Sequence, residues 1–424
     1  MIRKFKYTLE KLKKSKDGKT VASNFGYLML LQIASYIFPL LTIPYLARVI
    51  GVEGFGKIAF AAAVIVWLKT VSDWGFNYTA TRDVALNKDD LNKVSEIFSN
   101  VLWARIILML ISFLILIIAI AFIPYFKENK SILLVSFLLV PGNIFFPEWF
   151  FQAMERMKFI TILSLTSKIV FTLLVFIFIK EKSDFILQPL FTSLGFLLSG
   201  LFSMYIILIK WKIKICKPNI KDIYKTIMSS KDVFLTNILP NLYNSLAVVI
   251  LGFWGGSIAN GVYDAGRKFI GIAQSFMLVI IRVLFPYLSR KMDKHNLFAK
   301  LYLSISLIGA LFLFFLSPVL IKSFFTEEFY GAITVLQISS FSVFFVALNN
   351  VYGLNYLILK GHEKILRNIT FVCSIIGFLI SVPLVYNFSY IGATLTLVIT
   401  QAILGFSVAL KAKLISRNDI HTIT

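Results

Sequence analysis

The chain has 424 residues, 58% of them hydrophobic, and a formal net charge of +22 from 43 Lys and Arg against 21 Asp and Glu. Soluble domains average about 45–50% apolar residues and rarely contain apolar runs of 20 or more, so the composition excludes an ordinary soluble protein. The positive charge lies in short segments between apolar runs, which argues against a nucleic-acid-binding surface and is typical of the cytoplasmic loops of a membrane protein.

The chain opens on a basic segment, "MIRKFKYTLEKLKKSKDGKT". The apolar run after it is longer than the apolar region of a signal peptide, and no small-residue cleavage site follows. We therefore predict a cytoplasmic basic tail over 1–21 and a first membrane helix that is retained.

Apolar segments of the length needed to cross a bilayer, about 20 residues, recur along the rest of the chain. They predict an all-α polytopic membrane protein with about twelve transmembrane helices. The predicted spans are 22–46, 56–76, 97–123, 131–153, 159–179, 185–209, 233–254, 262–287, 301–321, 331–359, 368–386 and 390–410.

The longest segment between spans, 210–232, divides the chain into two sets of six. We predict a six-helix N-terminal lobe over 22–209, a cytoplasmic linker over 210–232, a six-helix C-terminal lobe over 233–410 and a cytoplasmic tail over 411–424. Because six is even, both lobes enter the membrane from the same side, and a repeat between them would be parallel.

Lys and Arg also predict the orientation. With the N-terminus inside, the inside segments hold 30 of these residues and the outside segments 7, while 6 lie within spans. This excess of positive charge on the inside predicts that the N-terminus and the C-terminus both lie in the cytoplasm.

Charges inside spans are costly, by about 2.5–3.5 kcal/mol at a helix centre even on the most forgiving scale, and usually face a protein interior or a wet cavity. Arg105 and Arg282 lie near span ends and fit a snorkelling position. Lys69 and Lys168 fit it poorly, and Lys168 lies near the midplane, so we expect it to line a cavity.

Two charge pairs have the spacing that places both partners on one helical face. These are Lys69 with Asp73 and Asp264 with Lys268, and each has the alternative reading of an internal ion pair that only lowers the cost of insertion. Arg282 follows Lys268 by fourteen residues, which returns it to nearly the same face about 21 Å along the axis, with Gln274 beside that face.

Amide side chains add a polar stripe. Asn237, Asn241 and Asn244 recur at i, i+4 and i+7 on the seventh span, and Gln32 belongs to a weaker stripe on the first. Interhelical hydrogen bonding is the alternative use of such residues. With the surplus of cations, we predict two lobes around a central cationic cavity, which favours an anionic cargo such as a phosphate.

Nothing in the sequence indicates catalysis. The three histidines, His295, His362 and His421, are predicted in cytoplasmic loops or the tail, there is no phosphate-binding loop, and every outside loop is about a dozen residues or shorter. Cys216 and Cys373 are predicted in a loop and a span, so neither a disulfide nor a metal site is expected.

Two segments carry a resemblance to a known family. "PLLTIPYLARVIGVEGFGKIAFA" with "SDWGFNYTATRDVA" resembles the first hairpin of O-antigen (O-unit) flippases, of the polysaccharide transporter branch of the multidrug/oligosaccharidyl-lipid/polysaccharide exporter superfamily. "FFPEWFFQAMERMKFITI" resembles the end of their fourth span. The order and length of the spans match over nearly the whole chain.

The resemblance implies a multi-pass protein of the bacterial inner membrane. It would move an undecaprenyl-diphosphate-linked O-antigen oligosaccharide from the cytoplasmic to the periplasmic leaflet by alternating access, for lipopolysaccharide biosynthesis. Its partners would be this lipid-linked substrate and, as candidates, an O-antigen polymerase and a chain-length regulator. No cofactor and no nucleic acid are expected.

In the resembled family, cavity cations engage the diphosphate. The corresponding residues here are Arg48, Lys69, Lys168, Arg267, Lys268 and Arg282. The polar cavity residues are Gln32, Asn237, Asn241, Asn244 and Gln274. The intramembrane carboxylates Asp73, Glu148 and Asp264 are candidates for coupling to H+ or Na+, with ion pairing as the alternative for Asp73 and Asp264.

Two other functions compete. A cation-coupled multidrug exporter of the same superfamily would need carboxylates for cationic drugs, yet the spans hold more cations than anions. An O-antigen polymerase or membrane glycosyltransferase would carry large outside loops with catalytic residues, and the predicted outside loops are too short for this.

Overall fold

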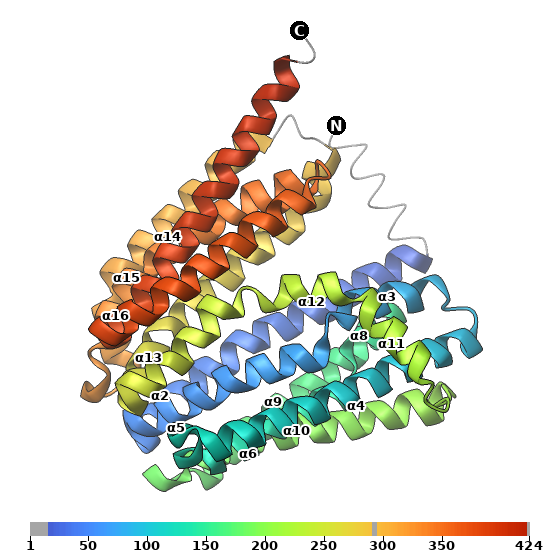
Figure 1. Ribbon diagram of the computed structural model, residues 1–424, viewed down its shortest axis with the longest axis horizontal. Coiled ribbons are helices and arrows are strands. Elements are labelled where there is room, and N and C mark those ends of the chain that lie inside the picture. The colour runs from blue at the N-terminus through green and yellow to red at the C-terminus, as the bar shows by residue number, and fades with distance from the viewer. Residues whose placement is uncertain (1–15, 291–294, 422–424) are drawn as a thin grey trace. The chain divides into compact units, whose positions relative to one another are not determined.

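The described part of the chain is helical throughout. The computed structural model describes the backbone of residues 16–290 and 295–421, and the side chains within 23–281 and 295–416. No strand occurs in these ranges, and long helices dominate the ribbon (Figure 1). The all-α fold class is therefore confirmed.

The helices follow one another with short connections. The α-helices are α2 (Lys16–Asp73), α3 (Phe76–Leu86), α4 (Leu91–Phe122), α5 (Pro124–Glu128), α6 (Lys130–Phe137), α7 (Leu139–Phe145), α8 (Glu148–Ala153), α9 (Met157–Phe178), α10 (Leu187–Tyr205), α11 (Ile220–Ser229), α12 (Lys231–Ile238), α13 (Asn241–Arg290), α14 (His295–Phe324), α15 (Ala332–Leu348) and α16 (Glu363–His421). The shorter elements are η1 (Lys182–Ile186), η2 (Ile206–Lys210), η4 (Glu327–Phe329) and η5 (Asn349–Ile358), of which η2 and η5 are π-helices.

Nine helical segments within the described ranges are long and apolar enough to cross a membrane. Three of them span 64, 41 and 54 residues, whereas about 20 suffice for one crossing. The helices that form them, α2, α13 and α16, each contain one non-helical residue, at Gly51, Gly256 and Ser389. The protein is thus a multi-pass membrane protein, and the number of twelve passes stays a prediction.

The break in α16 reverses the chain. Ser389 adopts a positive φ of 50°, and residues on either side of it pack together: Cys373 shares a buried cluster with Leu404 and Val408. Gly377 likewise lies against Thr400. Two legs of one helix therefore run antiparallel, as the ribbon shows at the red end of the chain (Figure 1).

The chain forms two compact units. Unit 1 comprises residues 1–45 and 68–235, and unit 2 comprises 46–67 and 236–424. Helix α2 contributes to both units: residues 16–45 and 68–73 belong to unit 1, and residues 46–67, which include its break, belong to unit 2.

The predicted linker folds within unit 1. The Lys214 N–H donates to Ser95 Oγ at 3.1 Å, and the Cys216 N–H donates to Ser99 Oγ at 2.8 Å. Trp103 Nε1 donates in turn to the Cys216 carbonyl at 3.1 Å. One face of α4 thus holds this extended segment through side chains that take the place of a strand partner.

Two predicted spans are interrupted. The fourth consists of α6, α7 and α8, with a break at Phe146 and Pro147. The seventh breaks between α12 and α13 at Pro240, which has no N–H for a helical hydrogen bond. The expectation that Asn237 continues the stripe of Asn241 and Asn244 on one helix is therefore wrong.

The two cysteines match expectation. Cys216 is exposed in the segment between η2 and α11, and Cys373 is buried within α16. His295 is predicted in a loop, but the structure places it at the start of helix α14. Its side chain is buried, and its Nε2 lies 3.2 Å from the Val351 carbonyl oxygen.

Close backbone approach in unit 2 gives a prediction on glycine. A Cβ on Gly261 would collide with the Val52 carbonyl oxygen, whereas a Cβ on Gly309 would meet nothing within 4 Å. Overpacking costs about 1–3 kcal/mol, so Gly261→Ala should lower the midpoint temperature of thermal unfolding. The same change at Gly309 should leave it unchanged or raise it, because Ala favours a helix over Gly by about 1 kcal/mol. Equal midpoints for the two variants in a thermal-shift measurement would contradict this packing.

Candidate functional site

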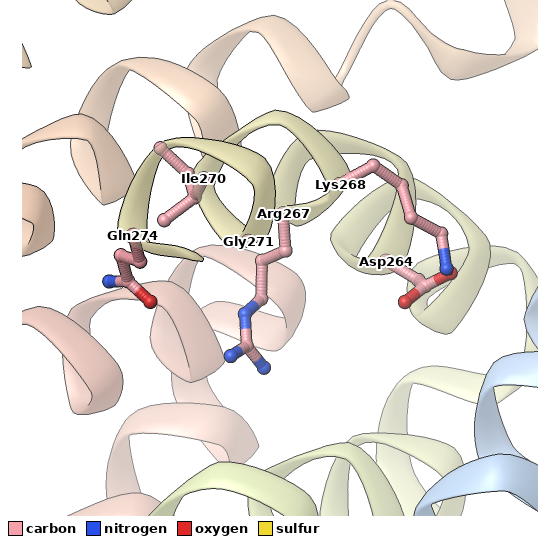
Figure 2. A pocket seen from close by; sticks show the side chains of 6 residues that line it. All are labelled: Asp264, Arg267, Lys268, Ile270, Gly271 and Gln274. Atoms are coloured by element: carbon pink, nitrogen blue, oxygen red, sulfur yellow. The ribbon is translucent and has the colours of Figure 1, made fainter. Parts of the chain in front are cut away.

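Unit 2 contains a pocket of about 290 Å³ along the second leg of α13 (Figure 2). Its lining residues recur at helical spacing on one face of this leg, so a single helix presents all of them. They are Asp264, Arg267, Lys268, Ile270, Gly271 and Gln274.

Lys268 and Asp264 form an ion pair within this pocket. Lys268 Nζ lies 2.7 Å from Asp264 Oδ2, and both side chains are about one-third exposed, at 36% and 28%. The same ammonium lies 5.5 Å from the centre of the Phe55 ring. The predicted pairing of these two residues is confirmed, and it leaves the pair with no net charge.

Arg267 supplies the net charge of the pocket. Its Nη1 donates to Tyr263 Oη at 3.3 Å, and its guanidinium lies 5.2 Å from the centre of the same ring. No carboxylate of the described residues forms an ion pair with it, and its head projects away from the Lys268–Asp264 pair (Figure 2). The pocket therefore carries one uncompensated, half-buried positive charge with free N–H donors, a feature suited to an anion.

Unit 1 holds a second group of charges around Arg105. This side chain is only 3% exposed, and its Nη2 donates to the Asp73 carboxylate and, at 2.9 Å, to Asn143 Oδ1. The snorkelling position predicted for Arg105 is wrong. The Asp73 carboxylate pairs with Arg105 across helices and not with Lys69 one turn away.

A second pocket, of about 160 Å³, lies among α2, α9, α10 and the break before α8, all in unit 1. Glu148 and Lys168 both line it. Lys168 thus lines a cavity, as its depth in the fifth span predicts. The remaining lining residues are Leu31, Ser35, Phe146, Ser164, Ser167, Phe196 and Ser199.

The other predicted site residues are dispersed. Gln32 in unit 1 donates to Tyr36 Oη at 2.5 Å, and Arg48 in unit 2 is exposed. Asn241 and Asn244 are half-buried at the start of α13. The side chain of Arg282 lies outside the described residues. Some of the predicted residues thus line one of the two pockets, and the others lie at separate positions in both units.

The structure also brings residues into these sites that the sequence patterns do not predict. Asn143 joins the Arg105 group, and four serines surround Glu148 and Lys168. The run "SLTSK" on α9 was the available signal, since Ser164, Ser167 and Lys168 share one helical face. Within the described ranges, no group of three or more His, Cys, Asp or Glu side chains gathers as metal ligands would.

Comparison with known proteins places the chain among membrane transporters by sequence. A family model described as polysaccharide biosynthesis protein matches residues 21–292. A protein named "Putative O-antigen transporter" from Escherichia coli (strain K12) is 29% identical over 90% of this chain and 94% of its own length. A protein of the same name from Shigella dysenteriae is 26% identical over 90% of this chain and 97% of its own.

Solved structures share the fold. The lipid II flippase MurJ in an inward closed conformation has a TM-score of 0.74 and 15% identity, over 91% of this chain and 87% of its own. An inward-facing multidrug resistance transporter of the MATE family, in the MOP superfamily, has a TM-score of 0.64 and 15% identity, over 92% and 97% of the two chains. At this identity the likeness is one of fold.

The Arg105 group gives a prediction on stability. Arg105→Met leaves the mostly buried Asp73 carboxylate without its partner, so the free energy of unfolding should fall by about 3–5 kcal/mol. The double variant Asp73→Asn with Arg105→Met should recover much of this loss, because no unpaired charge remains buried.

The control lies on the same helix. Lys93 pairs with Glu96 at 2.9 Å, but both side chains are about half exposed, so Lys93→Met should change the free energy of unfolding by about 1 kcal/mol or less. Unfolding curves of the purified variants measure all three effects. A double variant no more stable than Arg105→Met would show that charge burial is not the cause.

Proposed function

The chain belongs to the polysaccharide biosynthesis protein family, since the family match spans more than half of its length, and from this premise we propose that it is a flippase for a lipid-linked saccharide. The substrate is an undecaprenyl-diphosphate-linked O-antigen oligosaccharide. The protein moves it from the cytoplasmic to the periplasmic leaflet of a bacterial inner membrane, with both termini in the cytoplasm.

The uncompensated charge of Arg267 is the observation that carries this proposal. A diphosphate is anionic and rich in acceptor oxygens, and a guanidinium binds such groups through charge-assisted hydrogen bonds. The pocket also presents Gln274, whose Nε2 donates to Ser342 Oγ at 3.1 Å. Lys268 can shift from Asp264 toward a bound phosphate, because both side chains are partly exposed.

Transport, not catalysis, agrees with the comparisons. The curated relatives are named transporters, and the solved structures of the same fold are transporters or a flippase. The chain is therefore assigned as a transporter and not as a polymerase or glycosyltransferase. Movement of the two units by alternating access is part of the proposal.

Export of cationic drugs is the weaker alternative. A cationic drug needs a free carboxylate in the membrane, but Asp73 and Asp264 are both engaged, by Arg105 and Lys268. Glu148 shares its pocket with Lys168, which repels a cation. Asp73 and Asp264 act first as ion-pair partners, whereas Glu148 is an intramembrane carboxylate that forms no ion pair with the described residues.

A genetic test follows from the role of Arg267. A strain that lacks this gene should lose its O-antigen ladder on lipopolysaccharide, and a plasmid copy should restore it. Arg267→Gln should reduce the ladder about tenfold or more, because a hydrogen bond to a charged group contributes about 1.5–3 kcal/mol. Lys322→Gln, which removes an exposed cation that lies over the Tyr330 ring, is the matched control. A full ladder from Arg267→Gln at normal membrane levels would refute the role of this residue.

The sign of the ligand charge is tested at Asp264. Asp264→Asn removes the partner of Lys268 and makes the pocket more positive, so the Kd for pyrophosphate should fall about fivefold, as about 1 kcal/mol of Coulomb energy predicts. A cationic dye should respond in the opposite direction. Titration of both probes into the purified protein measures this, and tighter dye binding by the variant, with weaker pyrophosphate binding, would favour the drug exporter.

A further inference from the structure

The pocket of unit 1 differs in chemistry from the pocket of unit 2. It is smaller, at about 160 Å³, and it is lined by an acid, a base and four hydroxyl groups: Glu148, Lys168, Ser35, Ser164, Ser167 and Ser199. Four separate elements contribute these side chains, so the packing of unit 1 itself brings them together.

The two charged groups face the pocket without pairing. Glu148 and Lys168 form no ion pair within 4.0 Å of each other, and no ion pair or hydrogen bond of the described side chains engages either of them. The pocket is therefore neutral as a whole, yet each charge keeps its hydrogen-bonding capacity. A ligand in this pocket therefore meets a strong hydrogen-bond acceptor in Glu148 and a strong donor in Lys168, which suits a polar ligand that carries both donors and acceptors.

The hydroxyl groups also remain available. Ser35 Oγ donates to the Leu31 carbonyl at 2.8 Å, and Ser199 Oγ donates to the Leu163 carbonyl at 3.2 Å, so both oxygens keep acceptor positions. Among the described side chains, Ser164 and Ser167 have no hydrogen-bond partner. The ligand that fits must both donate and accept around its edge.

The apolar part of the lining sets the shape. Phe146 and Phe196 lie with ring centres 6.4 Å apart at an angle of 55°. A volume of 160 Å³ equals that of roughly five water molecules, which is room for one small ring. Polar groups beside aromatic surfaces are typical of sites that orient a small ligand.

We propose that this pocket binds a single uncharged sugar ring of the transported saccharide. Glu148 accepts from the hydroxyl groups of the ring, Lys168 donates to its oxygens, and Ser164 and Ser167 do both. The inference rests on the proposed function for the identity of the cargo. It gives Glu148 and Lys168 a role in recognition of the glycan and separates them from the binding of the diphosphate.

Direct binding of free glycosides tests this. The full-length protein, in lipid nanodiscs without glycoside detergent, is titrated with methyl α-D-glucopyranoside, methyl α-D-galactopyranoside and methyl N-acetyl-β-D-glucosaminide, and saturation-transfer NMR reports contact. At least one glycoside should bind the unaltered protein. Glu148→Gln should weaken this binding about tenfold or more, and Ser167→Ala about fivefold, as the loss of a charged and a neutral hydrogen bond predicts.

Ser136→Ala is the matched control, because Ser136 is buried in α6 of the same unit and does not line the pocket. Its glycoside affinity should equal that of the unaltered protein. Ser167→Ala is the milder change and keeps the test valid where Glu148→Gln reduces folding. Absence of binding by all three glycosides, or equal binding by the control and both pocket variants, would overturn the sugar pocket.

Titration of pyrophosphate into the same nanodiscs separates the two proposals. Glycoside binding without pyrophosphate binding would refute the role of the unit 2 pocket and leave the sugar pocket standing. Pyrophosphate binding without glycoside binding would refute the sugar pocket and leave the proposed diphosphate site intact.

Discussion

The cost of a charge in hydrocarbon governs this structure. Even on the most forgiving scale it is about 2.5–3.5 kcal/mol at a helix centre, so each charged side chain in a span needs a partner or a polar cavity. Arg105 meets this requirement with Asp73 and Asn143, and Lys268 with Asp264. Arg267 and Lys168 meet it in pockets. The helices are arranged so that opposite charges of one span or of neighbouring spans come together, and the two candidate binding sites are where this pairing is incomplete.

The fold follows from the sequence to a large extent because hydropathy over about 20 residues is a strong signal. The predicted spans at 97–123 and 159–179 correspond to α4 and α9 within a few residues. The interruptions were harder to predict. A proline is tolerated in many membrane helices, so Pro240 and Pro147 gave no means of telling a kink from a break, and tertiary contacts decide which occurs.

The candidate sites were predictable only where partners are close in sequence. Asp264 and Lys268 are one turn apart, and this spacing predicts the ion pair that the structure shows. Arg105 and Asp73 are 32 residues apart, and only the packing of α4 against α2 decides that Asp73 pairs with Arg105 instead of Lys69. The serines around Lys168 come from three helices, and no local spacing predicts that they meet. Patterns in a single sequence therefore do not predict which polar groups pair when they lie far apart in the chain.

These observations describe a protein whose two units hold two unlike pockets, one with a net positive charge and one neutral and rich in hydroxyl groups. A glycan joined to a lipid through a diphosphate contains both kinds of chemistry in one molecule. The charge of the first pocket and the neutrality of the second then act on different parts of one cargo.

The most direct measurement is translocation by the purified protein in vesicles. A diphosphate-linked lipid glycan and an uncharged glycolipid with the same glycan are placed in the inner leaflet, and a glycosidase outside reports their appearance. We expect the diphosphate-linked lipid to reach the outer leaflet much faster than in protein-free vesicles, and the uncharged glycolipid not to reach it. Equal rates for the two lipids, or no movement of either above the protein-free rate, would contradict it.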